Sequence, residues 1–269
     1  MHNKIISDQE AFFNQNALVE KSSNQASIFD IYSNKEQLSG LRWLGDKKII
    51  LDYGVGTATS IDIFLKNKSN IKHMFYGVDI AQQAVNVAKR KYPLYKFYKI
   101  KNNKIPQIEN NSVDGAYMLH VLHHATDHET IFLSIYDKLK KNGKFLINDL
   151  SSNNPFNKTA RSIFIHMPKF VKKRFGDDLV VGEGIPEKYK VDIPEVVRLL
   201  EKTGFKVEKV EYGHLFFFLF AWIDRFIPLS KIRIINSLYY KLIQLEEKLL
   251  IKPFFKKYAE VVAIKCSKK

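Results

Sequence analysis

The sequence has only one cysteine, Cys266, among its 269 residues. A single thiol excludes an intrachain disulfide framework and is typical of proteins from a reducing compartment. The first 16 residues lack the apolar run of a secretory signal, and no uncharged stretch reaches the roughly 18 apolar residues of a membrane-spanning helix. We therefore expect a cytoplasmic protein.

Acidic residues are scarce relative to basic ones, 28 against 43, which gives a formal net charge of +15. Such a charge favours anionic partners, namely nucleic acid, acidic lipid or a phosphorylated substrate. Residues 158–174 hold six lysines and arginines and no acid, interleaved with apolar side chains. This segment is a candidate contact with an anionic surface.

A buried strand, Lys48–Tyr53, is followed by a glycine turn at Gly54 and Gly56. The turn lacks the third glycine of a dinucleotide-binding fingerprint, and it lacks the lysine of a phosphate-binding P-loop. Asp52 stands just before the turn instead. A carboxylate there repels a pyrophosphate and suits a cofactor that carries an ammonium and a sulfonium.

A second apolar strand, His73–Val78, ends on Asp79, 27 residues after Asp52. Glycines at a strand-to-helix turn let a ligand approach bare backbone, and an acid that ends the next strand can accept both hydroxyls of a ribose. Together they predict a pocket for an adenosine-containing cofactor, and the charge of the turn favours S-adenosylmethionine.

Four ordered motifs within residues 48–150 carry a family resemblance. They are Asp52–Ala58 (DYGVGTA), Tyr76–Ile80 (YGVDI), Asn111–Tyr117 (NSVDGAY) followed by a histidine-bearing loop at His120–Asp127, and Leu139–Ile147 (LKKNGKFLI). The set resembles the class I S-adenosylmethionine-dependent methyltransferases, closest to the small-molecule members such as type 11 domains. The resemblance implies an enzyme and these cofactor-binding residues: Asp52, Tyr53, Gly54, Gly56, Asp79, Ile80, Asn102 and His120.

Two positions depart from the family pattern. Ala58 replaces the last glycine of the first motif, which is tolerated unless the backbone there needs a positive φ. The family often binds the adenine amino group with an acid after its third strand, but residues 99–106 contain none. Asn102 or Asn103 offers a side-chain oxygen in its place.

Alternating strands and helices predict a doubly wound, mostly parallel, seven-stranded sheet of the Rossmann-like methyltransferase type. We expect helices at 57–67, 80–92 and about 128–141, the last ended by Asn142-Gly143. Asp192 and Glu195 resemble a capping box for a helix at 193–203 that Gly204 ends. The remaining strands are expected at 144–150, 205–212 and 258–265.

The domain organisation predicted from these elements has five parts. They are a helical N-terminal lead-in at 1–47, a cofactor-binding core at 48–150, a substrate-side segment with the rest of the core at 151–212, a helical insertion at 213–257, and the final strand and tail at 258–269.

The insertion opens with nine apolar residues, Leu215–Ile223, and continues as an amphipathic basic run, Lys231–Lys257. Three interpretations stay open. It is a helical cap packed on the domain, a hairpin that lies on the inner face of an anionic membrane with its apolar side in the interface, or a nucleic-acid-binding element. The single apolar block favours the first two.

A hydroxyl acceptor requires a base, and histidine is the natural one near neutral pH. We rank His124 first, His123 second and Asp149 third, whereas a carbon or amine acceptor needs no base. The spacing His120-x-x-His123-His124 also suits a metal, but no clear carboxylate set accompanies it, so we predict no metal.

The sequence thus predicts an S-adenosylmethionine-dependent methyltransferase for a small or lipid-linked acceptor, peripheral on a membrane if the lipid interpretation of the insertion holds. An RNA or other nucleic-acid methyltransferase and a non-catalytic cofactor-binding scaffold are the alternatives.

Overall fold

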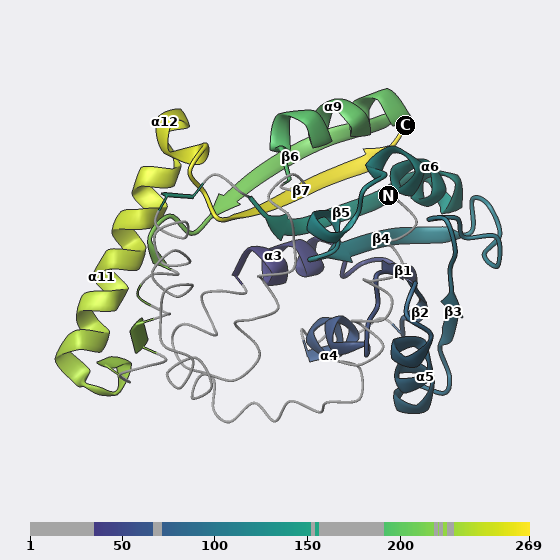
Figure 1. Cartoon of the computed structure of the whole chain (residues 1–269), viewed down its shortest axis with the longest axis horizontal. Coiled ribbons are helices and arrows are strands. Elements are labelled where there is room, and N and C mark those ends of the chain that lie inside the picture. Colours follow the sequence, from purple (N-terminus) through teal and green to yellow (C-terminus); the bar gives the residue numbers. More distant parts are fainter. Residues whose placement is uncertain are drawn as a thin grey trace.

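A seven-stranded sheet with the strand order β3-β2-β1-β4-β5-β7-β6 forms the centre of the molecule (Figure 1). The computed structural model describes residues 35–66, 72–151, 154–155, 191–217, 220, 223–224 and 229–269. β7 pairs antiparallel with both β5 and β6, and the other neighbouring strands pair in parallel. This arrangement confirms the predicted fold class.

The strands are β1 Ile49–Tyr53, β2 Met74–Asp79, β3 Lys96–Lys99, β4 Val113–Leu119, β5 Leu139–Leu150, β6 Phe205–Gly213 and β7 Val261–Lys268. The α-helices are α3 Lys35–Trp43, α4 Thr59–Lys66, α5 Gln82–Lys91, α6 His128–Lys138, α9 Ile193–Thr203, α11 Arg233–Leu250 and α12 Pro253–Lys256, with short 3-10 turns at η1 Leu122–His124 and η4 Leu229–Lys231.

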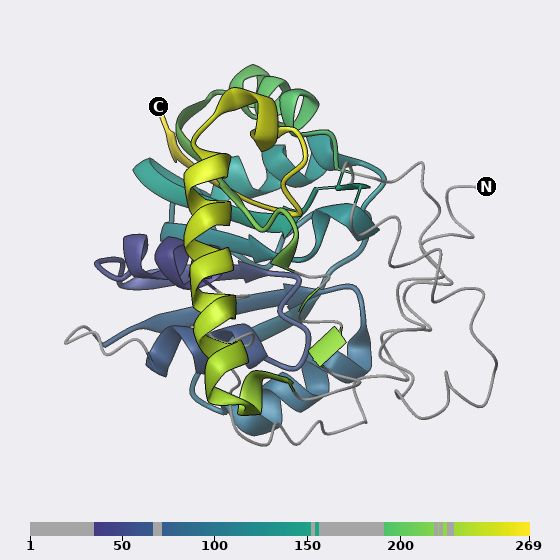
Figure 2. The ribbon, with the colours of Figure 1, turned by 90° about the vertical axis from the view of Figure 1, so that its left-hand side faces the viewer.

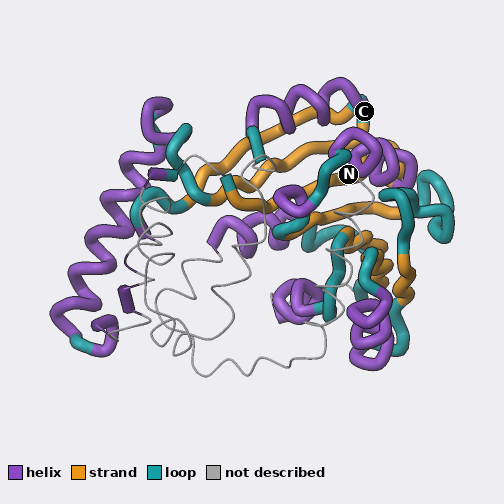
Figure 3. The backbone as a smooth tube through the Cα atoms, viewed as in Figure 1, coloured by secondary structure: helices purple, strands orange, loops and turns teal. Residues whose placement is uncertain are grey.

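Helices lie on both sides of the sheet (Figure 3). Successive residues of a strand point to opposite faces, so neighbours in the strand enter different cores. On β1, Ile50 packs with α3, α4 and α5, whereas Leu51 packs with α6 and α9. Tyr117 and Met118 of β4 divide in the same way. Burial on both faces explains why these strands read as continuous apolar runs.

Two predicted helix ends differ from the structure. The helix expected at 128–141 ends at Lys138, because Leu139 is fully buried and already pairs with Val113 of β4. Asn142 adopts a left-handed φ of 61° within β5 and so does not end the helix. At the start of α9, the Asp192 side chain makes no capping hydrogen bond, and Glu195 pairs with Arg198 instead, so no capping box forms.

Other boundaries agree better. Gly204 ends α9 with a φ of 108°, as the sequence predicts for a left-handed helix cap. The last strand begins at Val261, three residues later than expected, because Ala259 still belongs to the turn that leaves α12 and the Glu260 N–H donates to the carbonyls of Gly213 and His214.

The insertion contains α11, which lies at the end of the sheet where β6 ends (Figures 1 and 2). β6 and β5 are both antiparallel to β7, so β6 runs parallel to β5 and ends at the same sheet edge as β1, β4 and β5. Among the described residues, no helix is long and apolar enough to cross a bilayer.

Two side chains of the apolar block that opens the insertion point inward, because Leu215 and Phe217 are only 4% and 3% exposed. The open interpretation that places this block in a membrane interface therefore does not apply to these two side chains. The first 34 residues of the lead-in and the basic segment 158–174 lie outside the described residues.

Candidate active site

The glycine turn after β1 brings bare backbone to the carboxyl edge of the sheet. Gly54 and Gly56 have φ values of 80° and 52°, a region that favours glycine. A Cβ on Gly54 would lie 2.3 Å from Cγ2 of Val121, in the loop after β4, whereas a Cβ on Gly56 would meet nothing within 4 Å. Gly54 thus lets the two loops touch, and Gly56 faces open space.

Asp79, at the end of β2, fixes the other side of this space. Its Oδ2 accepts a hydrogen bond from the Gly56 N–H at 2.8 Å, and its Oδ1 accepts one from the Ala81 N–H at 2.8 Å. Burial raises the pKa of this carboxyl above its ordinary value, although the backbone donors oppose the shift. Each carboxylate oxygen offers more than one acceptor position, so Asp79 can still receive two ribose hydroxyls.

Asp52 is only 1% exposed, and its hydrogen-bond partners are side chains of the protein. Its Oδ2 accepts hydrogen bonds from the Ser60 hydroxyl, at the start of α4, and from the Tyr117 hydroxyl at 2.8 Å. Burial raises the pKa of Asp52 to about 7, against the effect of these two donors. Asp52 is therefore only partly ionised near neutral pH. Its hydrogen bonds connect the end of β1 to α4 and β4 and so stabilise the turn between β1 and α4.

Ala58 occupies the position where the family usually has glycine, and its φ of 64° lies in the left-handed region. The side chain is fully buried in the core formed with α3, α4 and α5. The condition under which alanine is unfavourable is thus met, because an L-residue in this region costs about 1–2 kcal/mol. Packing of the buried methyl offsets part of that cost.

The two predicted adenine contacts differ in exposure, because Asn103 is half-buried and Asn102 is exposed. Asn102 and Asn103 form the corner of a tight turn, with φ values of 54° and 58°, and Asn102 is exposed. Asn103 accepts a hydrogen bond from the hydroxyl of the buried Tyr53 at 3.4 Å. Ile80 is partly buried against the α6 and α9 core. The structure therefore connects Asn103, and not Asn102, to the end of β1.

The loop after β4 holds a histidine–aspartate pair. His123 Nδ1 lies 2.5 Å from Asp149 Oδ1, and the Leu122 N–H donates to Asp149 Oδ2 at 2.7 Å. Burial opposes ionisation of Asp149, but His123 and His120 hold its pKa below the ordinary value. An ionised carboxylate only accepts hydrogen bonds, so Nδ1 carries the hydrogen and Nε2 is left as the proton acceptor of the neutral ring.

The other groups of this loop have different surroundings. Burial, aided by the neighbouring His123, lowers the pKa of His124 to about 3. His120 has a left-handed φ of 56° and an exposed surface, yet desolvation lowers its pKa as well. His128 contacts the Leu122 carbonyl oxygen at 3.0 Å. Among the described residues, no three or more His, Cys, Asp or Glu side chains are arranged to hold a metal.

A second cluster of charges lies where β6 meets α11, and sequence reasoning did not find it. His214, fully buried with a φ of 59°, lies between Glu36 of α3 and Glu246 of α11. Its Nε2 is 3.3 Å from Glu36 Oε2, and its Nδ1 is 3.7 Å from Glu246 Oε1. Burial alone would lower the pKa of His214, but the two carboxylates raise it to about 9.

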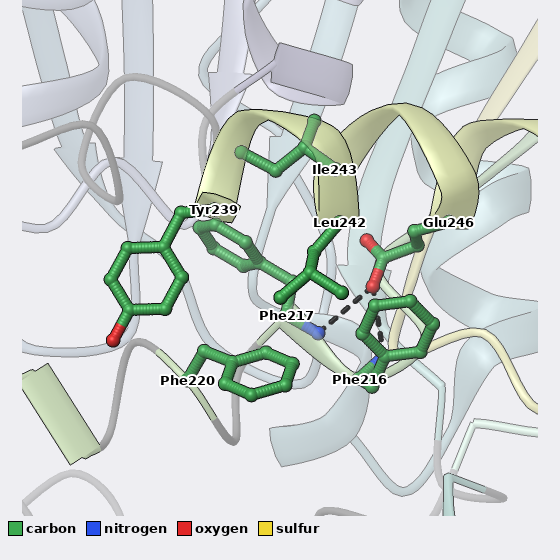
Figure 4. A pocket seen from close by; sticks show the side chains of 7 residues that line it. All are labelled: Phe216, Phe217, Phe220, Tyr239, Leu242, Ile243 and Glu246. Atoms are coloured by element: carbon green, nitrogen blue, oxygen red, sulfur yellow. Dashed lines mark hydrogen bonds between the residues drawn. The ribbon is translucent and has the colours of Figure 1, made fainter. Parts of the chain in front are cut away.

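Glu246 also accepts hydrogen bonds from the Phe216 and Phe217 N–H groups, both at 2.8 Å, beside a small apolar hollow (Figure 4). This hollow is in the insertion and is separate from the glycine turn and the histidine loop. One signal was present in the sequence, because Glu246 stands four residues after Leu242 on the apolar face of the predicted helix. A charge on that face indicates a buried partner.

The fold and the carboxyl-edge site indicate a protein that binds S-adenosylmethionine. The strand order reverses between β1 and β4, and ligands of open α/β sheets bind at such a switch point. The glycine turn, Asp79 and the histidine loop all lie there. The open space at Gly56 and the anchored carboxylate fit the nucleoside part of S-adenosylmethionine.

Comparison with known proteins also indicates a protein that binds S-adenosylmethionine. Residues 51–147, a little over a third of the chain, match the family model described as a methyltransferase domain. This part of the chain is therefore a methyltransferase domain, and its cofactor is S-adenosylmethionine. None of the curated proteins matches the sequence.

Solved structures resemble this chain in fold, although they share little sequence. Geranyl diphosphate C-methyltransferase from Streptomyces coelicolor has a TM-score of 0.60 at 10% identity, and the match covers 98% of both chains. A SAM dependent methyltransferase from Aquifex aeolicus has a TM-score of 0.51 at 16% identity, covering 88% of this chain and 93% of that chain.

Phosphoethanolamine N-methyltransferase 2 from Haemonchus contortus, solved with S-adenosyl-L-methionine, has a TM-score of 0.55 at 17% identity. The match covers 87% of this chain and 52% of that chain. The present chain thus corresponds to about half of the nematode enzyme.

Proposed function

We propose that this protein transfers a methyl group to a protic acceptor, small or lipid-linked, and that His123 removes the acceptor proton while Asp149 positions His123. The acceptor is expected at a membrane surface on the cytoplasmic side. The single observation that carries the chemical part is the 2.5 Å contact between His123 and Asp149 beside the glycine turn.

The chain's own residues account for binding. When bound, S-adenosylmethionine supplies an electrophilic methyl group on a sulfonium. Asp79 would accept the ribose hydroxyls, Gly54 and Gly56 would let the cofactor approach the backbone, and Asp52 would hold the turn through Ser60 and Tyr117. Ile80, Tyr53, His120 and Asn102 or Asn103 remain the proposed lining residues.

The roles of base and positioning residue follow from exposure and hydrogen bonding. The His123 side chain is 14% exposed, whereas Asp149 has no exposed surface and is fixed by donors from Leu122, His123 and Leu150. Asp149 therefore orients the imidazole and does not contact an acceptor. His124, with a pKa of about 3, is a much weaker base than an ordinary histidine. We accordingly place His123 before His124.

A small acceptor is compatible with the fold. Two structural neighbours are named for phosphoethanolamine and for geranyl diphosphate, so a sheet of this type accommodates small phosphorylated acceptors. A lipid-linked acceptor is favoured by the position of α11, at the same sheet edge as the site.

The test uses methyl-labelled S-adenosylmethionine and three fractions of a cell extract: lipids, water-soluble small molecules and RNA. We expect label in one of the first two fractions and a loss of at least about 100-fold in His123→Ala and Asp149→Asn, with cofactor affinity retained. His124→Ala serves as the neighbouring control and should lose much less.

Three other results of this experiment would each favour a different function. Label in RNA alone would favour the nucleic-acid methyltransferase, which now rests only on the +15 charge. Cofactor binding without any transfer would favour a scaffold. Full activity of His123→Ala would contradict proton removal by this residue and leave a carbon or amine acceptor that needs no base.

A further inference from the structure

We propose that the outward face of α11 binds the surface of a bilayer that contains anionic lipid. Such binding would bring the carboxyl edge of the sheet to a lipid-linked acceptor. In this respect the inference rests on the proposed function. The binding itself can be measured without any acceptor.

The inward face of α11 is fixed, which determines the face that remains outside. Tyr239 is 5% exposed and Glu246 is fully buried, and both point toward the segment that follows β6. Phe220 and Tyr239 approach with a ring-centroid distance of 5.9 Å (Figure 4). The two hydrogen bonds from Phe216 and Phe217 to Glu246 hold this face in register with the segment below it.

A second side of α11, about a third of a turn from the inward face, exposes a stripe of aliphatic side chains. Ile234, Leu238 and Leu245 are 82%, 53% and 48% exposed. Their spacing of four and seven residues places them on one side of the helix. Beyond the helix, Ile251 and Phe254 are 74% and 62% exposed. Figure 2 shows α11 in front of the sheet edge, with no described element over it.

The charges around the stripe are complementary to an anionic surface. The only acids between residues 229 and 259 are Glu246, which is buried, and Glu247, which pairs with Lys35. The basic residues of the same stretch are Lys231, Arg233, Lys241, Lys248, Lys252, Lys256 and Lys257. A basic helix with exposed aliphatic residues on one side is typical of a helix that lies in the membrane interface.

The exposed aliphatic groups favour a bilayer over nucleic acid. Proteins that bind single strands combine basic grooves with aromatic rings on which the bases stack. The outward stripe of α11 itself is aliphatic, and its burial in the acyl boundary contributes free energy that a phosphate backbone cannot supply. Within the insertion, α11 supplies this contact, whereas Leu215 and Phe217 of the apolar block are buried.

The test is flotation of the full chain with phosphatidylcholine vesicles that contain or lack about a third of phosphatidylglycerol. The stripe variant is Ile234→Ser with Leu245→Ser, whose side chains are 82% and 48% exposed. The matched control is Leu94→Ser with Leu133→Ser, on α5-side and α6 surfaces, with exposures of 83% and 46%. Circular dichroism and calorimetry with S-adenosylmethionine check that each variant is folded and binds cofactor.

We expect the wild-type protein to float with the anionic vesicles and to bind neutral vesicles at least tenfold more weakly. The stripe variant should bind anionic vesicles at least tenfold more weakly, and the control variant as well as wild type. Equal binding of the two variants, absence of wild-type binding, or preference for RNA over vesicles would overturn the proposal. A wild-type protein that binds cofactor but no vesicles would contradict only the membrane assignment. A wild-type protein that binds vesicles but transfers no methyl group would contradict only the proposed activity.

Discussion

The turn after β1 and the junction beneath α11 both depend on carboxylates, a half-buried one in the turn and buried ones in the junction. In the turn, Asp79 binds the backbone of Gly56 and Ala81 and keeps acceptor positions for a ligand. In the junction, Glu36 and Glu246 face the buried His214, and Glu246 also binds two backbone N–H groups. We propose that the first carboxylate serves a ligand, whereas the second set holds an appended helix.

The largest expected effect is on the junction. Glu246→Ala leaves His214 and the Phe216 and Phe217 N–H groups without their acceptor, and breaking a buried pair from one side costs about 3–5 kcal/mol. Glu247→Ala, the neighbouring control, removes an exposed pair with Lys35 and should cost less than about 1 kcal/mol. Denaturant unfolding measures both. Equal losses would show that the junction does not depend on the buried charge.

The junction should also make stability depend on pH. The pKa of His214 is about 9 when folded and near 6.5 when unfolded, so its pairing stabilises fully below about pH 6.5. That contribution, roughly 3 kcal/mol at most, is lost as the pH rises through about 9. Unfolding curves of wild type and His214→Asn between pH 6 and 10 measure the difference, and asparagine tolerates the left-handed backbone there. A parallel pH dependence of the two proteins would contradict the assignment.

The turn should show a smaller effect, seen in binding. Asp79→Ala removes the proposed ribose acceptor and should weaken the binding of S-adenosylmethionine by about 2–3 kcal/mol, or roughly 30–150-fold. Asp114→Ala is the matched control, because Asp114 also accepts a backbone N–H, from Ile49 at 2.9 Å, but at the opposite sheet edge. Calorimetric titration should find its affinity unchanged. A similar loss in both variants would indicate a general disturbance of the sheet.

The smallest effect concerns Ala58. Ala58→Gly relieves a left-handed backbone, which is unfavourable by about 1–2 kcal/mol, but deletes a buried methyl that contributes about 1 kcal/mol, so stability should change by less than about 1 kcal/mol. Ala88→Gly deletes an equally buried methyl in α5, where glycine is unfavourable, and should cost about 1–2 kcal/mol. Thermal unfolding of the two variants compares them, and a larger loss for Ala58→Gly would rule out strain at this position.

The same contrast explains what could be predicted from the sequence. Gly54, Gly56 and Asp79 act through backbone next to them in the chain or at the end of the adjacent strand, so short motifs identify them. His123 was ranked second because the sequence does not show that Asp149, 26 residues later, contacts His123 and not His124. Glu36, His214 and Glu246 come from three distant segments, and only the folded chain brings them together.

We expect the edge formed by the glycine turn and Asp79 to bind S-adenosylmethionine and not a dinucleotide. Calorimetric titration of the wild-type protein with S-adenosylmethionine and with NADH distinguishes the two ligands. S-adenosylmethionine should bind saturably at one site, and NADH should give no heat of binding. Tight binding of NADH with none of S-adenosylmethionine would contradict this expectation.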